Sequence, residues 1–256
     1  MDLEQYEVMF QQEEHHWWYR GMRQITRALL DRWYRGPRPA NILDAGCGTG
    51  GMVQWLARYG TVSGIDIAEA ALSRAHSRGL CSLTRGSVDA LPFQSGSFDL
   101  VTSFDVLYHL DVKNDFQALG EIHRVLRPGG TLLIRVPAHD WLRGRHDVSV
   151  HTRHRYGSRE LRAKLRREGF QTRHVTFANS ILFSLAPVKR LLERTDQEGV
   201  PDLWRPPGPI NDALAAVLGM ERFLASTTSI PVGLSLIAVA ERSMKPTRPE
   251  DPGGST

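Results

Sequence analysis

The chain has 256 residues and a formal net charge of +4, with 41% hydrophobic and 23% charged residues. This is the composition of an ordinary globular protein with a sizeable core, and so modest a charge does not by itself indicate nucleic-acid binding. The two cysteines, Cys47 and Cys81, do not suggest a disulfide framework. The longest apolar stretch, 230–240, is too short to cross a bilayer and no signal peptide is visible, so we expect a cytoplasmic protein.

The first two-thirds of the chain alternates between short apolar runs and segments with helical spacing. One or two helices are expected over residues 2–35, where Ile25, Leu29 and Trp33 recur at four-residue spacing. Strands are then expected at 41–45, 61–66, 81–85, 98–104 and 131–137, with helices at 50–59, 68–78 and 113–126. Strands that alternate with helices predict an α/β fold with a doubly wound parallel sheet.

The last third predicts further elements of the same domain. We expect a helix near 158–168, a strand near 170–177 and a last strand at 232–241, with a helical insertion over 179–226 between those two strands. The tail from 245 to 256 is rich in proline, glycine and charge, so we expect it to be disordered. Residues 1–244 would then form one domain, with an N-terminal helical lid over 1–38.

The loop after the first strand, NILDAGCGTGG at 41–51, fits two nucleotide-binding patterns. From Gly46 it fits the G-x-G-x-x-G pattern of dinucleotide-binding enzymes, and from Asp44 it fits D-x-G-x-G-x-G. In both patterns the glycines allow a close approach of backbone and ligand. A carboxylate at Asp44 favours a ligand with an ammonium group, such as S-adenosylmethionine, but this residue alone leaves both ligands open.

Two more carboxylates follow the next strands. Asp66 ends the second strand, where a carboxylate can bind ribose hydroxyls of either ligand, and Asp89 lies where it can accept a hydrogen bond from an adenine amino group. With the stretches GSVDALPFQSGSFDLV and EIHRVLRPGGTLLIRVP, the run 41–137 resembles class I S-adenosylmethionine-dependent methyltransferases of the type 11 group. The resemblance covers about 100 residues densely, with the remaining strands matched more loosely.

The resemblance implies a Rossmann-like, doubly wound seven-stranded sheet of order 3-2-1-4-5-7-6, with strand 7 antiparallel. It also implies S-adenosyl-L-methionine as cofactor and S-adenosyl-L-homocysteine as product. Carried over position by position, the expected cofactor contacts are Asp44, Gly46 and Gly48 at the methionyl part, Asp66 at the ribose, Ile67, Val88 and Asp89 at the adenine, and Phe104 and Asp105 beneath the sulfonium. Two of these have structural alternatives: Gly48 can simply make a tight turn, and Asp105 can cap a helix.

Methyl transfer from a sulfonium is an in-line displacement that needs a general base only when the acceptor atom is protonated. His109, five residues after Phe104, is equally compatible with a base and with a packing histidine. One of Trp17 and Trp18 is expected to face the cofactor, with Trp18 as our candidate, and the other to be structural. The fourth strand is not followed by the Asn/Asp-Pro-Pro-Tyr/Phe motif of amino-methylating DNA enzymes, so we do not expect methylation of DNA bases.

The stretch WLRGRHDVSVHTRHRY at 141–156 follows the fifth strand, on the side where α/β proteins bind ligands. We expect His146, His151, Arg155 and Tyr156 to bind the acceptor, with the histidines and Tyr156 also catalytic and Asp147 orienting a histidine. The stretch resembles a methyltransferase subgroup with H-D followed by H-x-x-R-R-Y. The structural alternative is that Arg155 and Tyr156 pin the next helix to the sheet. The histidine spacing matches no zinc pattern, so we expect no metal.

Together these features predict a metal-independent methyltransferase that acts on a small molecule, either anionic or amphipathic, with no membrane span. The insertion at 179–226 would wall the acceptor pocket. Two rivals stay open: methylation of RNA, and a regulatory or scaffold protein that binds the cofactor without catalysis. For the arginine-rich helix near 158–168, a solvated face is favoured over an RNA track. The oligomeric state is not encoded in these patterns.

Overall fold

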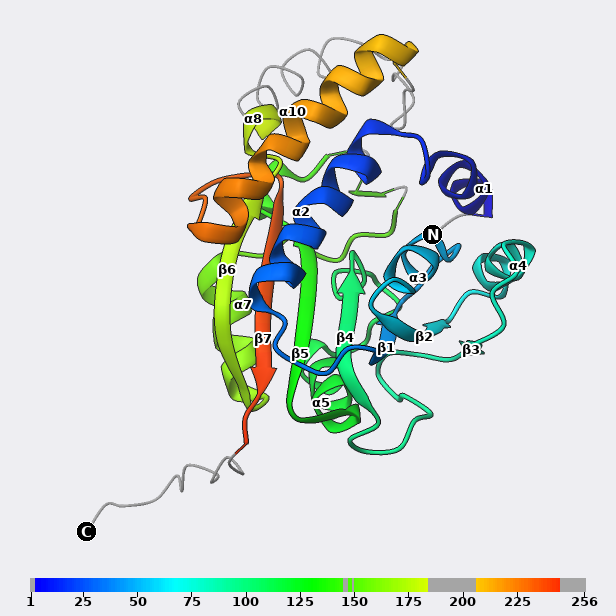
Figure 1. The fold of residues 1–256 in the computed structure, drawn as a ribbon, viewed down its shortest axis with the longest axis vertical. Coiled ribbons are helices and arrows are strands. Elements are labelled where there is room, and N and C mark those ends of the chain that lie inside the picture. The colour runs from blue at the N-terminus through cyan, green and yellow to red at the C-terminus, as the bar shows by residue number, and fades with distance from the viewer. Residues whose placement is uncertain (1–2, 145–146, 149, 184–205, 245–256) are drawn as a thin grey trace.

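The computed structural model describes residues 3–144, 147–148, 150–183 and 206–244. The described strands form one seven-stranded sheet of order β3-β2-β1-β4-β5-β7-β6 (Figure 1). The predicted strand order is therefore confirmed, and β7 is antiparallel to both of its neighbours as expected. His146, the tail 245–256 and the middle of the predicted insertion lie outside the described residues.

The strands follow the predicted runs closely. Their bounds are β1 Ala40–Ala45, β2 Gly60–Asp66, β3 Leu83–Arg85, β4 Phe98–Phe104, β5 Leu126–Pro137, β6 Phe170–Ala178 and β7 Ser235–Arg242. The main departure is β5, which begins five residues before the predicted 131 because Leu126 pairs with Phe98 of β4. The ladder then shifts register and resumes at Thr131, so the Pro-Gly-Gly turn lies within the strand.

The helices cover both faces of the sheet. They are α1 Leu3–Gln12, α2 Trp17–Trp33, α3 Gly51–Leu56, α4 Glu69–Ser77, α5 Asp115–Val125, α7 Ser158–Arg167, α8 Ser180–Phe183 and α10 Gly208–Thr227, with a short 3₁₀ turn at Asp140–Leu142. Helices α2 and α10 lie side by side on one face, and α5 and α7 lie on the other (Figure 1). No helix within the described ranges is long and apolar enough to cross a membrane.

The parallel pairing of β1 with β2 and β4, and of β4 with β5, places the carboxyl ends of these strands at one edge of the sheet. Ligands of open α/β sheets bind at this edge, since the loops that leave the strands diverge there. Asp44, Asp66 and Asp105 all lie at or just beyond strand ends on this edge. The fold therefore gathers carboxylates that are far apart in sequence.

Candidate active site

The glycine loop between β1 and α3 has positive φ angles, which residues with a side chain rarely adopt. Gly46, Gly48 and Gly50 have φ angles of +86°, +53° and +86°. A Cβ atom on Gly46 would lie 2.2 Å from Cγ2 of Val106, so this position excludes a side chain for steric reasons as well. The turn thus brings its backbone close to whatever binds at this edge.

The carboxylate of Asp66 holds this loop in place. Its Oδ2 accepts a hydrogen bond of 2.8 Å from the backbone N–H of Gly48, and its Oδ1 accepts one of 2.9 Å from the N–H of Ala68, just before α4. One side chain at the end of β2 therefore joins the glycine loop to the start of α4. A carboxylate oxygen can accept more than one hydrogen bond, so these contacts leave Asp66 able to bind a ribose as predicted.

Asp44 is buried next to the loop, with 2% of its surface exposed. The hydroxyl of Thr102 donates to its Oδ1 at 2.7 Å. Burial raises the pKa of Asp44 to about 7, an effect that the hydrogen bond from Thr102 opposes and the negative charge of Asp66 reinforces. A cation bound beside Asp44 would stabilise its ionised form.

Asp89, after β3, has one satisfied and one unsatisfied carboxylate oxygen. Its Oδ2 accepts a hydrogen bond of 2.9 Å from the N–H of Lys113. Its Oδ1 is buried and has no hydrogen-bond partner within the described part of the chain. An unpaired buried acceptor costs about 1–3 kcal/mol, so this oxygen fits a ligand that brings an N–H donor. Val88 is buried beside it, and Ile67 is 47% exposed just beyond Asp66.

Asp105 forms an ion pair with Arg135, a partner that the sequence analysis did not predict. Nε and Nη2 of Arg135, on β5, donate to Oδ2 of Asp105 at 2.9 and 2.6 Å. Asp105 has a φ angle of +58°, and the next helix, α5, begins ten residues later with Asn114 as its cap. The helix-cap alternative for Asp105 is therefore wrong.

Arg135 is almost completely buried, and its guanidinium is stacked between two aromatic rings. Its Cζ lies 4.8 Å from the centre of the Trp18 ring and 5.0 Å from that of Phe104. Trp17 instead contacts α10, since its backbone N–H donates to Asn211 at 2.8 Å. Of the two tryptophans, Trp18 is thus the one that lies over the ends of β4 and β5. Arg135 is the single charged residue in the apolar run TLLIRVP, and this was the sequence feature that could have indicated its cluster with Asp105, Trp18 and Phe104.

The N-terminal segment covers the glycine loop. Cε of Met9, on α1, lies 2.8 Å from the position that a Cβ on Gly48 would take. Glu13, just after α1, accepts a hydrogen bond of 2.6 Å from the hydroxyl of Thr49 in the loop. The buried Tyr6 lies close enough to Asp66 for that carboxylate to raise the pKa of its phenol, after the larger effect of burial. Helix α1 is therefore packed directly against the predicted cofactor loop.

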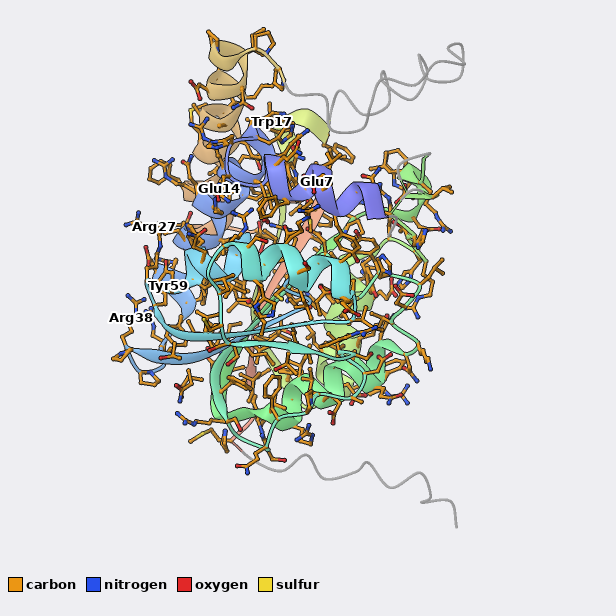
Figure 2. The ribbon with its side chains drawn as sticks, turned by 90° about the vertical axis from the view of Figure 1, so that its right-hand side faces the viewer. Glu7, Glu14, Trp17, Arg27, Arg38 and Tyr59 are labelled. Atoms are coloured by element: carbon orange, nitrogen blue, oxygen red, sulfur yellow. The ribbon has the colours of Figure 1, made fainter. Side chains whose placement is uncertain are left out.

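Arg78, just after α4, fastens this segment. Its Nη2 lies 2.6 Å from Oε1 of Glu13 and 3.0 Å from the backbone oxygen of Phe10, and its Nη1 pairs with Glu14. The Arg78 and Glu13 side chains are only 7% and 8% exposed, so this is a buried ion pair. Figure 2 shows α1 running alongside α4, with Glu7 and Glu14 on this side of the molecule.

Two of the predicted acceptor-side histidines come together. The rings of His109 and His151 lie 5.8 Å apart, and Nδ1 of His109 is 3.1 Å from Oδ2 of Asp111. The backbones of His109 and Thr152 form an antiparallel bridge, which joins the loop after β4 to the loop after β5. Burial lowers the pKa of His109, so its imidazole is neutral at pH 7 and able to accept a proton.

Arg155 and Asp147 form a pair of their own. Nε and Nη2 of Arg155 lie 2.9 and 3.0 Å from the two carboxylate oxygens of Asp147. Asp147 also accepts a hydrogen bond of 2.7 Å from the N–H of Gly144. The expectation that Asp147 orients a histidine is therefore corrected, because Asp147 holds Arg155 instead. This pairing conflicts with the predicted role of Arg155 in binding the acceptor.

Tyr156 is fully buried, which conflicts with its predicted catalytic and substrate-binding roles. Its hydroxyl donates to Oδ2 of Asp115 at 2.8 Å, and the same carboxylate pairs with Arg153 and with Lys164 of α7. These charges hold the pKa of Asp115 below its usual value although burial acts to raise it. The geometry supports the alternative in which Tyr156 pins α7 to the sheet.

The residues that the structure describes contain no group of three or more histidine, cysteine, aspartate or glutamate side chains able to hold a metal ion. His154, which stands where the related subgroup has an arginine, pairs with Glu160 at 3.1 Å.

The candidate site is composed of a glycine loop, three carboxylates at or after strand ends, the Arg135–Asp105 pair and two neighbouring histidines.

Comparison with known proteins agrees with this description. Residues 43–134 match the family model of the methyltransferase domain. The malonyl-[acyl-carrier protein] O-methyltransferase of Pseudescherichia vulneris is 38% identical over 100 residues, which cover 37% of this chain and 38% of the relative. The chain spans about half the length, or less, of the first curated relatives that it matches.

Solved structures share the fold over most of the chain. A chain of the complex between the Haloferax volcanii Trm112 methyltransferase activator and a methyltransferase is 20% identical, with a TM-score of 0.59 and coverage of 93% of this chain and 94% of that one. Phosphoethanolamine N-methyltransferase 2 of Haemonchus contortus, solved with S-adenosyl-L-methionine, is 19% identical, with a TM-score of 0.56 and coverage of 86% and 52%.

Replacement of Tyr156 by phenylalanine separates the two roles of this residue. We expect Tyr156→Phe to lower the free energy of unfolding by about 1.5–3 kcal/mol, because a buried hydrogen bond to a charged carboxylate is lost. Activity per folded molecule should stay the same. Denaturant unfolding and turnover of the same preparation measure both. Tyr59→Phe is the matched control, since that hydroxyl makes only a 3.3 Å contact with the exposed Asp31. Lost turnover with unchanged stability would restore the catalytic role.

Proposed function

We propose that this chain, whose residues 43–134 match the family model of the methyltransferase domain, is a class I S-adenosylmethionine-dependent methyltransferase that transfers the methyl group of S-adenosylmethionine to a small-molecule acceptor. The observation that carries the proposal is the set of carboxylates at the cofactor edge. Asp44 is buried and ready to meet a cation, Asp66 borders the glycine loop, and Asp89 has an unpaired buried oxygen.

The charges around the loop favour this cofactor over a dinucleotide. Asp44, Asp66 and Glu13 all lie within or against the loop, where a pyrophosphate would meet negative charge. In the proposed complex Asp44 faces the ammonium group, Asp66 the ribose hydroxyls and Oδ1 of Asp89 the adenine amino group. S-adenosylmethionine, when bound, supplies a methyl group on a sulfonium centre that is open to in-line displacement. Trp18, Phe104 and the Arg135–Asp105 pair form the floor and exclude water.

The acceptor side is assigned to His109 and His151. A general base is needed when the acceptor atom carries a proton, and a neutral imidazole is suited to that task near pH 7. Nδ1 of His109 lies 3.1 Å from the Asp111 carboxylate and also accepts a 3.4 Å contact from the Asp111 backbone N–H, so we assign the basic role to the imidazole and not to one of its nitrogens. His146 stays a candidate from the sequence.

A small acceptor is favoured because α1 is packed over the glycine loop and narrows the approach to this edge. The pairing of Arg155 with Asp147 gives no support to an anionic acceptor in particular. The exposed apolar side chains of Ile181 and Ile210, within the predicted insertion, fit an amphipathic acceptor. Methylation of RNA is the rival activity. The proposed location is the cytoplasm, with which two free cysteines are compatible.

The activity is tested by release of S-adenosylhomocysteine. We expect the chain to bind this product and not NAD, and to form it from S-adenosylmethionine in the presence of a panel of small hydroxy, amino and carboxylic acceptors. Asp66→Ala should weaken binding at least tenfold, since it removes charge-assisted hydrogen bonds of about 1.5–3 kcal/mol each and releases the loop. Calorimetry and product chromatography give both readouts. Tight NAD binding would refute the assignment, and turnover with tRNA alone would favour the rival.

The affinity for S-adenosylmethionine should depend on the ionisation of Asp44. Its pKa of about 7 means that a growing fraction of free protein is protonated at acid pH, and only the ionised form attracts the ammonium group. Affinity should therefore rise from pH 5 to 7, by roughly tenfold per pH unit, and level off above pH 7. Titrations at constant ionic strength measure the profile. Asp44→Asn should bind weakly with a flat profile, and a wild-type profile that is also flat would exclude Asp44 from the ammonium site.

The N-terminal segment is proposed to act as a lid fastened by Arg78. Loss of this arginine leaves Glu13 buried without its partner, so Arg78→Met should loosen residues 3–20. We expect trypsin to cut at Arg20 and Arg23 at least ten times faster in this variant, and S-adenosylhomocysteine to slow the cleavage. The control is Arg85→Met, which breaks an exposed pair with Glu69 and a 3.4 Å contact with the backbone oxygen of Ile67, and leaves the Arg78–Glu13 pair in place. Equal rates in all proteins, with and without product, would make the segment a fixed part of the core.

A further inference from the structure

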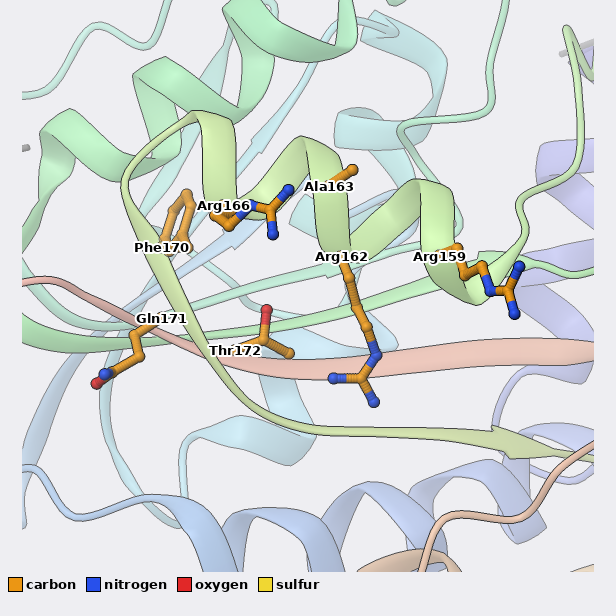
Figure 3. A pocket seen from close by; sticks show the side chains of 7 residues that line it. All are labelled: Arg159, Arg162, Ala163, Arg166, Phe170, Gln171 and Thr172. Carbon is orange, nitrogen blue, oxygen red and sulfur yellow. The ribbon is translucent and has the colours of Figure 1, made fainter. Parts of the chain in front are cut away.

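A groove of about 400 Å³ lies between helix α7 and the start of strand β6, away from the site described above. It is lined by three arginines and four uncharged residues: Arg159, Arg162, Ala163, Arg166, Phe170, Gln171 and Thr172. Figure 3 shows the arginines in a row along α7, with Arg162 directed toward β6. We call this feature the α7–β6 groove.

The three arginines are exposed, and they differ from the other basic residues of α7 in their contacts. Lys164 pairs with Asp115 and Glu160, and Arg167 stacks on the ring of Phe116 at 4.1 Å. By contrast, Arg159, Arg162 and Arg166 have no acidic partner within the ranges that the structure describes. Their spacing of three and four residues puts them on one face, where like charges repel each other. An anionic partner would relieve this repulsion.

The dimensions of the groove fit a short row of carboxylates. Seven residues of helix separate Arg159 from Arg166, or roughly 10 Å of length. Neighbouring arginines at these spacings lie about 5–6 Å apart. In an extended peptide, alternate residues point the same way and lie about 6.8 Å apart, so two or three alternating acidic side chains span the row. The planar guanidinium binds a carboxylate through two parallel hydrogen bonds.

Nucleic acid fits the groove less well. Single strands are held by bases stacked on exposed aromatic rings, and the one aromatic ring in the lining, Phe170, is only 4% exposed. Tight phosphate-driven binding uses about 6–10 phosphate contacts, which is more than three arginines supply. Simple addition of a strand to β6, the last strand of the sheet, is also disfavoured because a bulge between Thr172 and His174 interrupts its ladder.

We propose that the α7–β6 groove docks a short acidic segment of a partner protein, bound through two or three carboxylates by Arg159, Arg162 and Arg166. Helix α7 begins two residues after Tyr156, so its Arg159 end follows directly from the loop beyond β5. A docked partner would therefore lie next to that loop without blocking the cofactor edge. The inference does not depend on the proposed methyl transfer.

The test uses the full chain and a fluorescein-labelled peptide of four glutamates that alternate with serines. Fluorescence anisotropy should show binding that weakens as salt rises from 50 to 200 mM. The triple variant Arg159→Gln/Arg162→Gln/Arg166→Gln should bind the peptide at least tenfold more weakly. The matched control, Arg27→Gln/Arg32→Gln/Arg35→Gln, removes the same charge from exposed positions in and after α2 and should bind as the parent does.

Three results would overturn the proposal. They are no peptide binding by the parent, an equal loss in both triple variants, and tighter groove-dependent binding of an octameric oligouridine than of the peptide. The last result would identify a phosphate track instead. Circular dichroism and thermal unfolding show that each variant is folded whether or not the chain binds S-adenosylhomocysteine, so failure of this proposal stays distinct from failure of the proposed function.

Discussion

The carboxylate of Asp66 is the interaction on which the geometry of the cofactor edge depends. It receives one backbone N–H from the glycine loop and one from the residue before α4, so it fixes the loop relative to two neighbouring strands. The positive φ angles of Gly46 and Gly48 are tolerated because those residues are glycine, and the turn they form is held by this acceptor. A carboxylate that orders the loop is also close enough to take part in binding there.

Charge is distributed unevenly across the site. The cofactor side holds Asp44 and Asp66, which have no cationic partner at ion-pair distance in the described part of the chain, whereas Glu13 is neutralised by Arg78 and the floor beyond β4 holds the neutralised pair of Asp105 and Arg135. A buried pair of this kind contributes little net stability, but loss of either member would leave a charge unpaired. The stacking of Trp18 on Arg135 links the N-terminal segment to this pair. This contact would couple closure of the proposed lid to the floor through one guanidinium.

The strand order was implied by the resemblance of residues 41–137 to class I methyltransferases, and the structure confirms it. Parallel strands deliver their carboxyl ends to one edge, so Asp44 and Asp66 lie at the same edge of the sheet, and a shared ligand with Asp89 stays a prediction. The partners of Asp105 and Tyr156 could not be predicted in this way. Asp105 meets Arg135 across 30 positions, and Tyr156 meets Asp115 across 41.

Such side-chain pairings depend on packing between loops rather than on any periodic pattern. The histidine- and arginine-rich stretch after β5 illustrates the consequence. Its composition resembles that of a reactive site. However, Arg155 forms an ion pair with Asp147, and the Tyr156 hydroxyl donates a hydrogen bond to Asp115. Among the described histidines of this stretch, His151 is the one whose ring lies next to that of His109. Residue type alone did not distinguish an anchor from an acceptor contact, because both use the same polar groups.

The most direct test of the cofactor assignment is a calorimetric comparison of S-adenosylhomocysteine with its analogue that carries hypoxanthine in place of adenine. The exchange replaces the amino group that would donate to the unpaired Oδ1 of Asp89 by a carbonyl oxygen. We expect the analogue to bind at least tenfold more weakly, because the buried oxygen stays unpaired and faces a second acceptor. Asp89→Asn, whose amide can donate, should narrow the difference. Equal affinity of the two ligands for the parent chain would exclude Asp89 as the adenine contact.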